Sequence, residues 1–166
     1  MDTLTAEILR EVFDYDEHTG VMTWKKSPAN NSKLLGKEAG CPQANQYGKL
    51  YIKINVFKKR YLRSRLAFLW MTGHWPKECI DHINGDSLDD RWSNLREATV
   101  QQNNWNRKKR KKDLSLPMGV RKTPSNKYSS RISCNKNEIY LGVFNTLQEA
   151  SNAYQEKRKE LFNEYA

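Results

Sequence analysis

An adjacent acid and histidine are the residues of this sequence best suited to chemistry. Asp81 and His82 lie in the stretch from Ile80 to Asp86, and two asparagines follow at intervals, Asn94 and Asn103. Hydrolysis of a phosphodiester requires a base that deprotonates water and a cation that neutralises charge on the phosphate and the leaving oxygen. An imidazole, a carboxylate and amide oxygens can supply these functions. The stretch therefore predicts a one-metal site that cleaves nucleic acid.

The two adjacent side chains are expected to act on different groups. Neighbouring residues on a strand point to opposite sides, so Asp81 is expected to reach a metal ion and His82 the attacking water. The amide of Asn103, on a following helix, would be a second ligand. Asn94 is interpreted as a structural clamp rather than a reactant. Oxygen ligands with open positions favour Mg²⁺ or Mn²⁺, one ion per site, over zinc.

A longer pattern around this pair resembles a known family. It consists of Asp81 to Asp86, Asp90-Arg91, Asn94-Leu95-Arg96 and Asn103. This pattern is similar to the signature of HNH endonucleases, the ββα-metal nucleases, and particularly to phage and intron homing enzymes. The resemblance implies that His82 is the general base and that Asp81 and Asn103 are metal ligands. It also implies that Asn94 ties together the loop between two strands. The last position of the motif is Asn here, where the family name has His.

The charge of the chain indicates the class of its partner. Its 29 Lys and Arg residues outnumber its 19 Asp and Glu residues, for a formal net charge of +10. Basic residues cluster near Lys58 to Arg65 and in the run Arg107 to Lys112. We therefore expect double-stranded DNA as the partner. Contacts are expected from Lys53, on the basic face of a strand, and from Arg107, Lys108, Lys109 and Arg110. A solvated linker and a nuclear localisation signal are competing interpretations of the run.

Location is predicted from what the sequence lacks. No segment approaches the roughly 20 apolar residues of a spanning helix, and the first residues do not have a signal-peptide pattern. The cysteines are odd in number, are far apart and include no Cys-x-x-Cys pair. Free thiols are therefore expected, rather than disulfides or a zinc site. We expect a phage-encoded protein in the cytoplasm of a bacterial host.

The elements that must position the nuclease residues are predicted from periodicity and from breaker residues. They are a helix from Thr3 or Thr5 to Phe13, a strand at 21–24, a loop over 36–48, strands at 50–56 and 61–62, a helix at 63–72 closed by Gly73, and a helix at 97–106. In the strand at 50–56, four alternating apolar residues are expected to face the core.

From Gly119 the pattern changes to three short strands, near 120–121, 128–133 and 139–144, before a helix at 147–162. Motifs such as Gly119-Val120-Arg121 and Tyr140-Leu141-Gly142 resemble the AP2 DNA-binding domain, a three-stranded sheet packed on one helix. The resemblance implies that the sheet enters the major groove. By position it implies DNA contacts from Arg121, Lys122, Lys127, Tyr128, Arg131 and Ser133. Core packing is expected for Tyr140.

The predicted architecture is modular and of the α+β class. A β-rich N-terminal region with flanking helices (1–76) precedes the HNH ββα-metal motif (77–106), a basic linker (107–117) and an AP2-like domain (118–166). The predicted function is a metal-dependent, site-specific DNA endonuclease of the homing type, acting as a monomer that nicks one strand per binding event. The alternatives are a catalytically inactive, sequence-specific DNA-binding regulator and a non-specific HNH nuclease.

Overall fold

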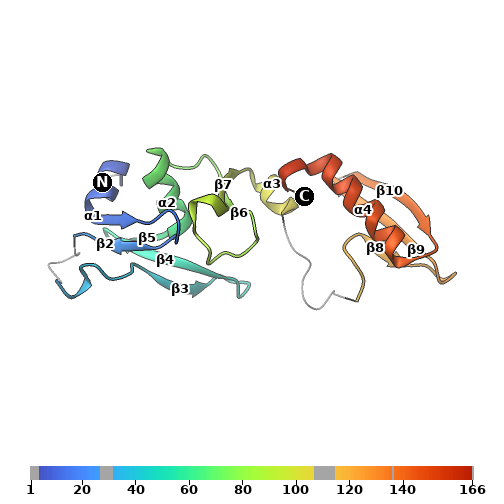
Figure 1. Cartoon of the computed structure of the whole chain (residues 1–166), viewed down its shortest axis with the longest axis horizontal. Helices are drawn as coiled ribbons and strands as arrows, with labels where there is room; N and C mark the ends of the chain where they lie inside the picture. Colours follow the sequence, from blue (N-terminus) through green and yellow to red (C-terminus); the bar gives the residue numbers. More distant parts are fainter. Residues whose placement is uncertain (1–3, 27–31, 107–114, 136, 166) are drawn as a thin grey trace. The chain divides into compact units, whose positions relative to one another are not determined.

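The computed structural model describes residues 4–26, 32–106, 115–135 and 137–165 of the chain (Figure 1). The chain forms two compact units, residues 1–103 and residues 104–166. The basic run with Arg107, Lys108, Lys109 and Arg110 lies outside the described residues. The predicted boundaries at 76 and 106 stay predictions.

The first unit opens with helix α1 (Ala6–Val12), which Thr5 caps by accepting a hydrogen bond from the backbone amide of Ile8. The predicted helix extended to Phe13, but Phe13 is extended and begins strand β1 (Phe13–Tyr15). β1 pairs antiparallel with β2 (Met22–Trp24). The rings of Phe13 and Trp24 lie 4.4 Å apart between centroids. This cross-strand packing explains why Phe13 belongs to β1 rather than to α1.

A three-stranded antiparallel sheet follows, in the order β3 (Cys41–Ala44), β4 (Leu50–Val56) and β5 (Lys59–Leu62). The prediction of a loop over 36–48 was wrong for β3, an edge strand that contains Pro42. An edge position tolerates the missing amide of proline. In β4, Ile52, Ile54 and Val56 are buried as predicted, whereas Leu50 is 43% exposed.

Helix α2 (Arg63–Thr72) has the predicted bounds, and Gly73 ends it in the left-handed conformation that glycine adopts without penalty. Its residues Leu66 and Leu69 are buried in the core of the first unit. α2 contacts α1, β4, β5 and the next strand, β6 (Cys79–His82). This helix therefore links the N-terminal sheets to the strand that carries the candidate nuclease residues.

The segment 77–106 has the predicted order of two strands and a helix. β6 pairs antiparallel with β7 (Leu95–Ala98), which follows the short 3-10 helix η3 (Trp92–Asn94). Helix α3 (Val100–Trp105) comes next. The sequence predicted that this helix begins at Glu97, but Glu97 pairs with Ile80 in the hairpin. Leu95 packs in one core with Phe13, Met22 and Leu66. The N-terminal region and the hairpin thus fold on a shared core.

The second unit contains the antiparallel sheet β10-β9-β8, formed by β8 (Val120–Lys122), β9 (Tyr128–Cys134) and β10 (Asn137–Phe144). Helix α4 (Leu147–Phe162) lies along this sheet and contacts all three strands (Figure 1). Thr146 and Glu149 form a capping box at its start. The predicted strands and helix are confirmed. Tyr140 is not in the core as expected, because it is 57% exposed.

Two sequence predictions concern the chain as a whole. Within the described residues, Cys41, Cys79 and Cys134 are all free thiols, as predicted. Among the helices that the structure describes, none combines the length and the apolar character required to cross a bilayer.

Candidate nuclease site

Asp81 is buried on one face of the β6–β7 hairpin, where it forms an ion pair with its cross-strand neighbour. The register places Asp81 opposite Arg96. The Nε and Nη2 atoms of Arg96 lie 2.9 and 2.8 Å from Oδ2 of Asp81. The side chain of Asp81 is only 4% exposed, and that of Arg96 is 13% exposed. Arg96 thus compensates the charge of the buried carboxylate, whereas an isolated buried charge would be strongly unfavourable.

Asn103 lies on the same side of the hairpin as Asp81. Cys79 is two residues before Asp81 on β6, so the two side chains share a face. The side chain of Asn103 forms a hydrogen bond with the Cys79 thiol. Burial raises the pKa of this thiol, and the bond with Asn103 lowers it by a smaller amount. Cys79 therefore stays a neutral thiol, which donates to the carbonyl oxygen of Ala98 at 3.0 Å.

The donors on this face fit a hard divalent cation. Asp81 supplies a carboxylate and Asn103 an exposed amide, and oxygen ligands of this type suit Mg²⁺ or Mn²⁺. Magnesium commonly takes only one or two protein ligands and fills its other positions with water and phosphate oxygens. Among the described residues, no group of three or more His, Cys, Asp or Glu side chains could hold a metal ion. The donor set therefore does not resemble a closed structural zinc site.

His82 points to the opposite face of the hairpin, where a buried acid binds its ring. Its Nε2 lies 2.9 Å from Oδ1 of Asp90, and the two side chains are 6% and 2% exposed. Oδ2 of Asp90 accepts a hydrogen bond from Nε of Arg63 at 2.8 Å. Arg63, the first residue of α2, also pairs with Glu38 at 2.6 Å. The ring of His82 is thus connected to a buried ion-pair chain that reaches α2.

Asn94 connects the two ends of the loop between β6 and β7. Its Oδ1 accepts from the backbone amide of Asn84 at 2.9 Å, and its Nδ2 donates to Oδ1 of Asn84 at 3.1 Å. The same Nδ2 donates to the carbonyl oxygen of Asp89 at 2.7 Å. The residue is buried. These are contacts that a loop clamp would make, and the catalytic importance of the clamp stays a prediction.

Asp89 braces the same loop from the surface. It accepts hydrogen bonds from Nε and Nη2 of Arg91, at 2.7 and 2.6 Å, and from Nδ2 of Asn84 at 2.8 Å. The hydrogen bonds from Arg91 are the main reason that the pKa of Asp89 falls from 3.8 to about 2. Asp89 is thus a turn and salt-bridge residue. The contact of Asp90 with His82 is not marked by any spacing in the sequence.

The outer face of the C-terminal sheet carries part of the predicted DNA-contact set. Val120, Ser130 and Ile132 are buried on the α4 side, so Arg121, Arg131 and Ser133 alternate to the other face. The register Lys122↔Tyr128 puts these two residues on the α4 side. Adjacent strand residues point in opposite directions, so these two side chains lie on the face opposite to Arg121, and their DNA contacts stay predictions. Lys127 is exposed in the turn before β9.

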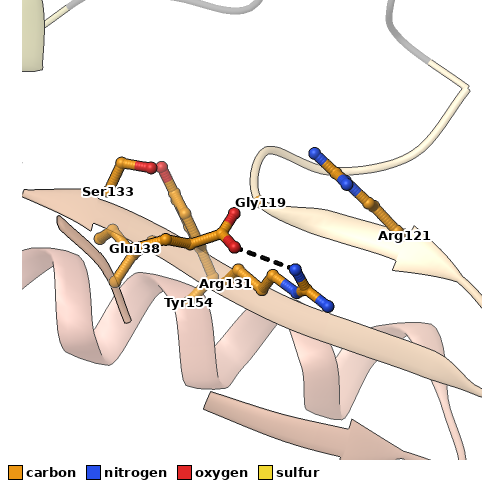
Figure 2. A pocket seen from close by; sticks show the side chains of 7 residues that line it. Gly119, Arg121, Arg131, Ser133, Glu138 and Tyr154 are labelled. Atoms are coloured by element: carbon orange, nitrogen blue, oxygen red, sulfur yellow. Dashed lines mark hydrogen bonds and ion pairs between the residues drawn. The ribbon is translucent and has the colours of Figure 1, made fainter. Parts of the chain in front are cut away.

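Arg121 and Arg131 border an open pocket of about 270 Å³, which Gly119, Ile132, Ser133, Glu138 and Tyr154 also line. Figure 2 shows the ion pair between Arg131 and Glu138, which are 2.9 Å apart. The guanidinium of Arg131 also lies over the ring of Tyr140, 5.5 Å from its centroid. Lys53, predicted as another contact, lies half-buried on β4 and is paired in register with Cys41.

Comparison with known proteins locates the family resemblance. Residues 61–105 match the family model described as HNH endonuclease. The chain is also similar to a protein of Acanthamoeba polyphaga mimivirus named as an uncharacterized HNH endonuclease. The two are 33% identical over 135 residues, which is 80% of this chain and 63% of that protein. The chain thus spans less than two thirds of the viral relative's length. No solved structure matches the chain.

The matched segment contains β6, β7 and α3, together with Asp81, His82, Asn94 and Asn103. The AP2-like nature of residues 118–166 and the homing type stay predictions. Both similarities support an endonuclease, and the resemblance to HNH endonucleases lies in the segment that forms the candidate site.

Proposed function

We propose that the protein is a metal-dependent DNA endonuclease of the homing type, with its active site on the β6–β7 hairpin and α3. The observation that carries the proposal is the arrangement of the hairpin. Asp81 and Asn103 lie on one side of it, and His82 on the other side is held by Asp90 through Nε2. Asp81 and His82 are neighbours on β6, and Asn103 lies on the helix that follows the hairpin.

In the proposed mechanism, His82 takes a proton from a water molecule that attacks the scissile phosphorus. Asp81 and Asn103 would hold one Mg²⁺ or Mn²⁺ ion, which supplies charge stabilisation to the phosphate and the leaving 3′ oxygen. Asn94 keeps the loop between β6 and β7 closed through its hydrogen bonds with Asn84 and Asp89. Rigid placement of this kind accounts for a large share of the rate of such reactions.

Arg96 lies beside the proposed metal ligand. In the structure its guanidinium neutralises Asp81. The same guanidinium could also make a bidentate contact to a phosphate of the DNA backbone. Arg96 thus belongs to the DNA-binding side of the proposed site.

The C-terminal unit is proposed to read DNA through the outer face of its sheet. Arg121 and Arg131 supply positive charge there, and the Nε atom of Arg131 is buried without a hydrogen-bond partner in the described structure. A phosphate oxygen or a base edge could contact the exposed part of this side chain. We propose that the unit is AP2-like, and that the protein acts as a monomeric nickase. The viral relative supports a phage or viral origin.

An inactive DNA-binding regulator is the second candidate function. The Asp81–Arg96 ion pair favours it, because a carboxylate held by a guanidinium is less available to a cation. A non-specific nuclease would retain the same hairpin chemistry and would lack base reading by the C-terminal sheet.

One experiment separates these candidates. Purified full-length protein is incubated with random-sequence duplex DNA and Mg²⁺, and both strands are sequenced to map the cut positions. The proposal predicts cuts at a preferred sequence that disappear when EDTA is added. Cuts without sequence preference would favour the non-specific nuclease. Tight binding without cuts in Mg²⁺ or Mn²⁺ would favour the regulator.

A further inference from the structure

The buried carboxylate of Asp90 lies between His82 and Arg63. It accepts from Nε2 of His82 through Oδ1 and from Nε of Arg63 through Oδ2, at 2.9 and 2.8 Å. All three side chains are at most 6% exposed. Arg63 comes from helix α2, at the start of the matched segment and 18 residues before Asp81 in sequence. The contact therefore connects the proposed base to an element outside the ββα hairpin.

We propose that Asp90 is the positioning residue of the nuclease, holding the His82 ring through Nε2 in the orientation in which it takes the proton from water. The inference rests on the proposed function, in which His82 is the base. A histidine ring that donates from one nitrogen to a fixed carboxylate is set in tautomer and orientation. The proton moves from water to the His82 ring, and the hydroxide oxygen forms the new bond to phosphorus. The bond between phosphorus and the 3′ oxygen breaks, and its electron pair leaves with the 3′ oxygen. The proton on Nε2 remains in its hydrogen bond with Asp90.

The side chain of Asp90 is not required to place its own backbone. The carbonyl oxygen of Asp90 accepts a hydrogen bond from the Tyr15 hydroxyl at 2.7 Å. Gly20 packs so closely on the Asp90 backbone that an added Cβ would lie 2.4 Å from its carbonyl carbon. These two contacts hold the loop from the N-terminal side. The carboxylate is thus available to hold the histidine rather than the chain.

Arg63 holds Asp90 in turn and has a second acid of its own. Its Nη1 lies 2.6 Å from Oε1 of Glu38, and its Nη2 donates to the carbonyl oxygen of Leu88 at 3.3 Å. Loss of the Asp90 carboxylate would therefore leave Arg63 partnered by Glu38. Glu38 offers a matched control, because Glu38→Gln removes one acid from Arg63 without touching His82.

The test compares single-turnover cleavage by full-length wild type, Asp90→Ala, Asp90→Asn, Glu38→Gln and His82→Ala, with DNA affinity measured for each. Asp90→Ala is expected to lower kcat about 10- to 100-fold with KM and DNA affinity unchanged. Asp90→Asn should fall between Asp90→Ala and wild type, because its one amide oxygen must serve two donors. Glu38→Gln should cleave at nearly the wild-type rate. The Nε2–H proton resonance of His82 should be visible by NMR in wild type and should be lost in Asp90→Ala.

The outcomes separate the role of Asp90 from the proposed function. An inactive His82→Ala protein beside fully active Asp90 variants would overturn the role of Asp90 and leave the proposed function standing. A loss of kcat that Glu38→Gln reproduces in full would also overturn it, because the ion pairs would then matter only for folding. Wild-type cleavage by His82→Ala would overturn the proposed function itself. If Asp90→Ala does not fold, as judged by circular dichroism, Asp90→Asn and the NMR signal decide.

Discussion

Arg96 donates from both Nε and Nη2 to a single carboxylate oxygen of Asp81, across the register of the β6–β7 hairpin. The acid proposed to bind the metal is therefore neutralised by a neighbour on the other strand. Two unit charges about 4 Å apart interact by about 4 kcal/mol at the effective dielectric constant typical of a protein surface. Arg96 is thus close enough to oppose a cation at Asp81.

Replacement of Arg96 should strengthen metal binding in the absence of DNA. We expect Arg96→Gln to bind Mn²⁺ several-fold more tightly than wild type in a calorimetric titration, because a competing positive charge is removed from Asp81. Arg91→Gln is the matched control, since Arg91 pairs with Asp89. An Arg96→Gln protein that binds Mn²⁺ no better than the control would show that Asp81 is not the ligand.

Loss of the Asn94 side chain should destabilise the first unit. Its three hydrogen bonds within the loop are buried or part-buried, so Asn94→Ala should lower the free energy of unfolding by about 3 kcal/mol, at about 1 kcal/mol for each bond. Urea denaturation followed by circular dichroism measures this difference. Asn55→Ala, at an exposed position, should change stability by less than about 0.5 kcal/mol. Equal values for the two variants would contradict the loop contacts.

Acid should weaken the loop through Asp89. Its pKa is lowered from 3.8 to about 2, chiefly by hydrogen bonds from Arg91, so the folded state favours the ionised carboxylate. The stability from Asp89 is then fully present above about pH 4 and is lost as the pH falls toward 2. The difference in unfolding free energy between wild type and Asp89→Asn should be constant from pH 5 to 7 and shrink below about pH 4. A difference in unfolding free energy that grows as the pH falls would contradict the lowered pKa of Asp89.

The sequence predicted the parts of the site that are local in the chain. The bounds of α2 follow from its helical pattern and Gly73, and the sheet and helix after Gly119 were expected from three short strand-like runs before a helix-like segment. The hairpin contacts of Asp90 and Arg96 could not be predicted. They depend on the register of β6 with β7 and on the packing of α2 against the loop, and neither is encoded in residue spacing. The same limit explains why Leu95 to Ala98 was expected to be partly helical.

Alternation on β8 gives a paired test of the C-terminal surface. Arg121 lies on the outer face of the sheet and Lys122 on the α4 side, although both are exposed and carry the same charge. Arg121→Gln should weaken DNA binding and reduce the slope of log K against log salt by about 0.9, the value of one phosphate contact. Lys122→Gln should change the slope by much less. Fluorescence anisotropy at several salt concentrations measures both, and equal effects would mean that the outer face does not bind DNA selectively.

The most direct test of the account is the cleavage rate of His82→Ala under single-turnover conditions with saturating Mg²⁺. Loss of a general base typically lowers a rate about 10²- to 10⁴-fold, while DNA affinity is shared among many cationic side chains. The account predicts a loss of that size, with DNA affinity within about twofold of wild type in anisotropy titrations. Cleavage at the wild-type rate by a folded His82→Ala protein would contradict it.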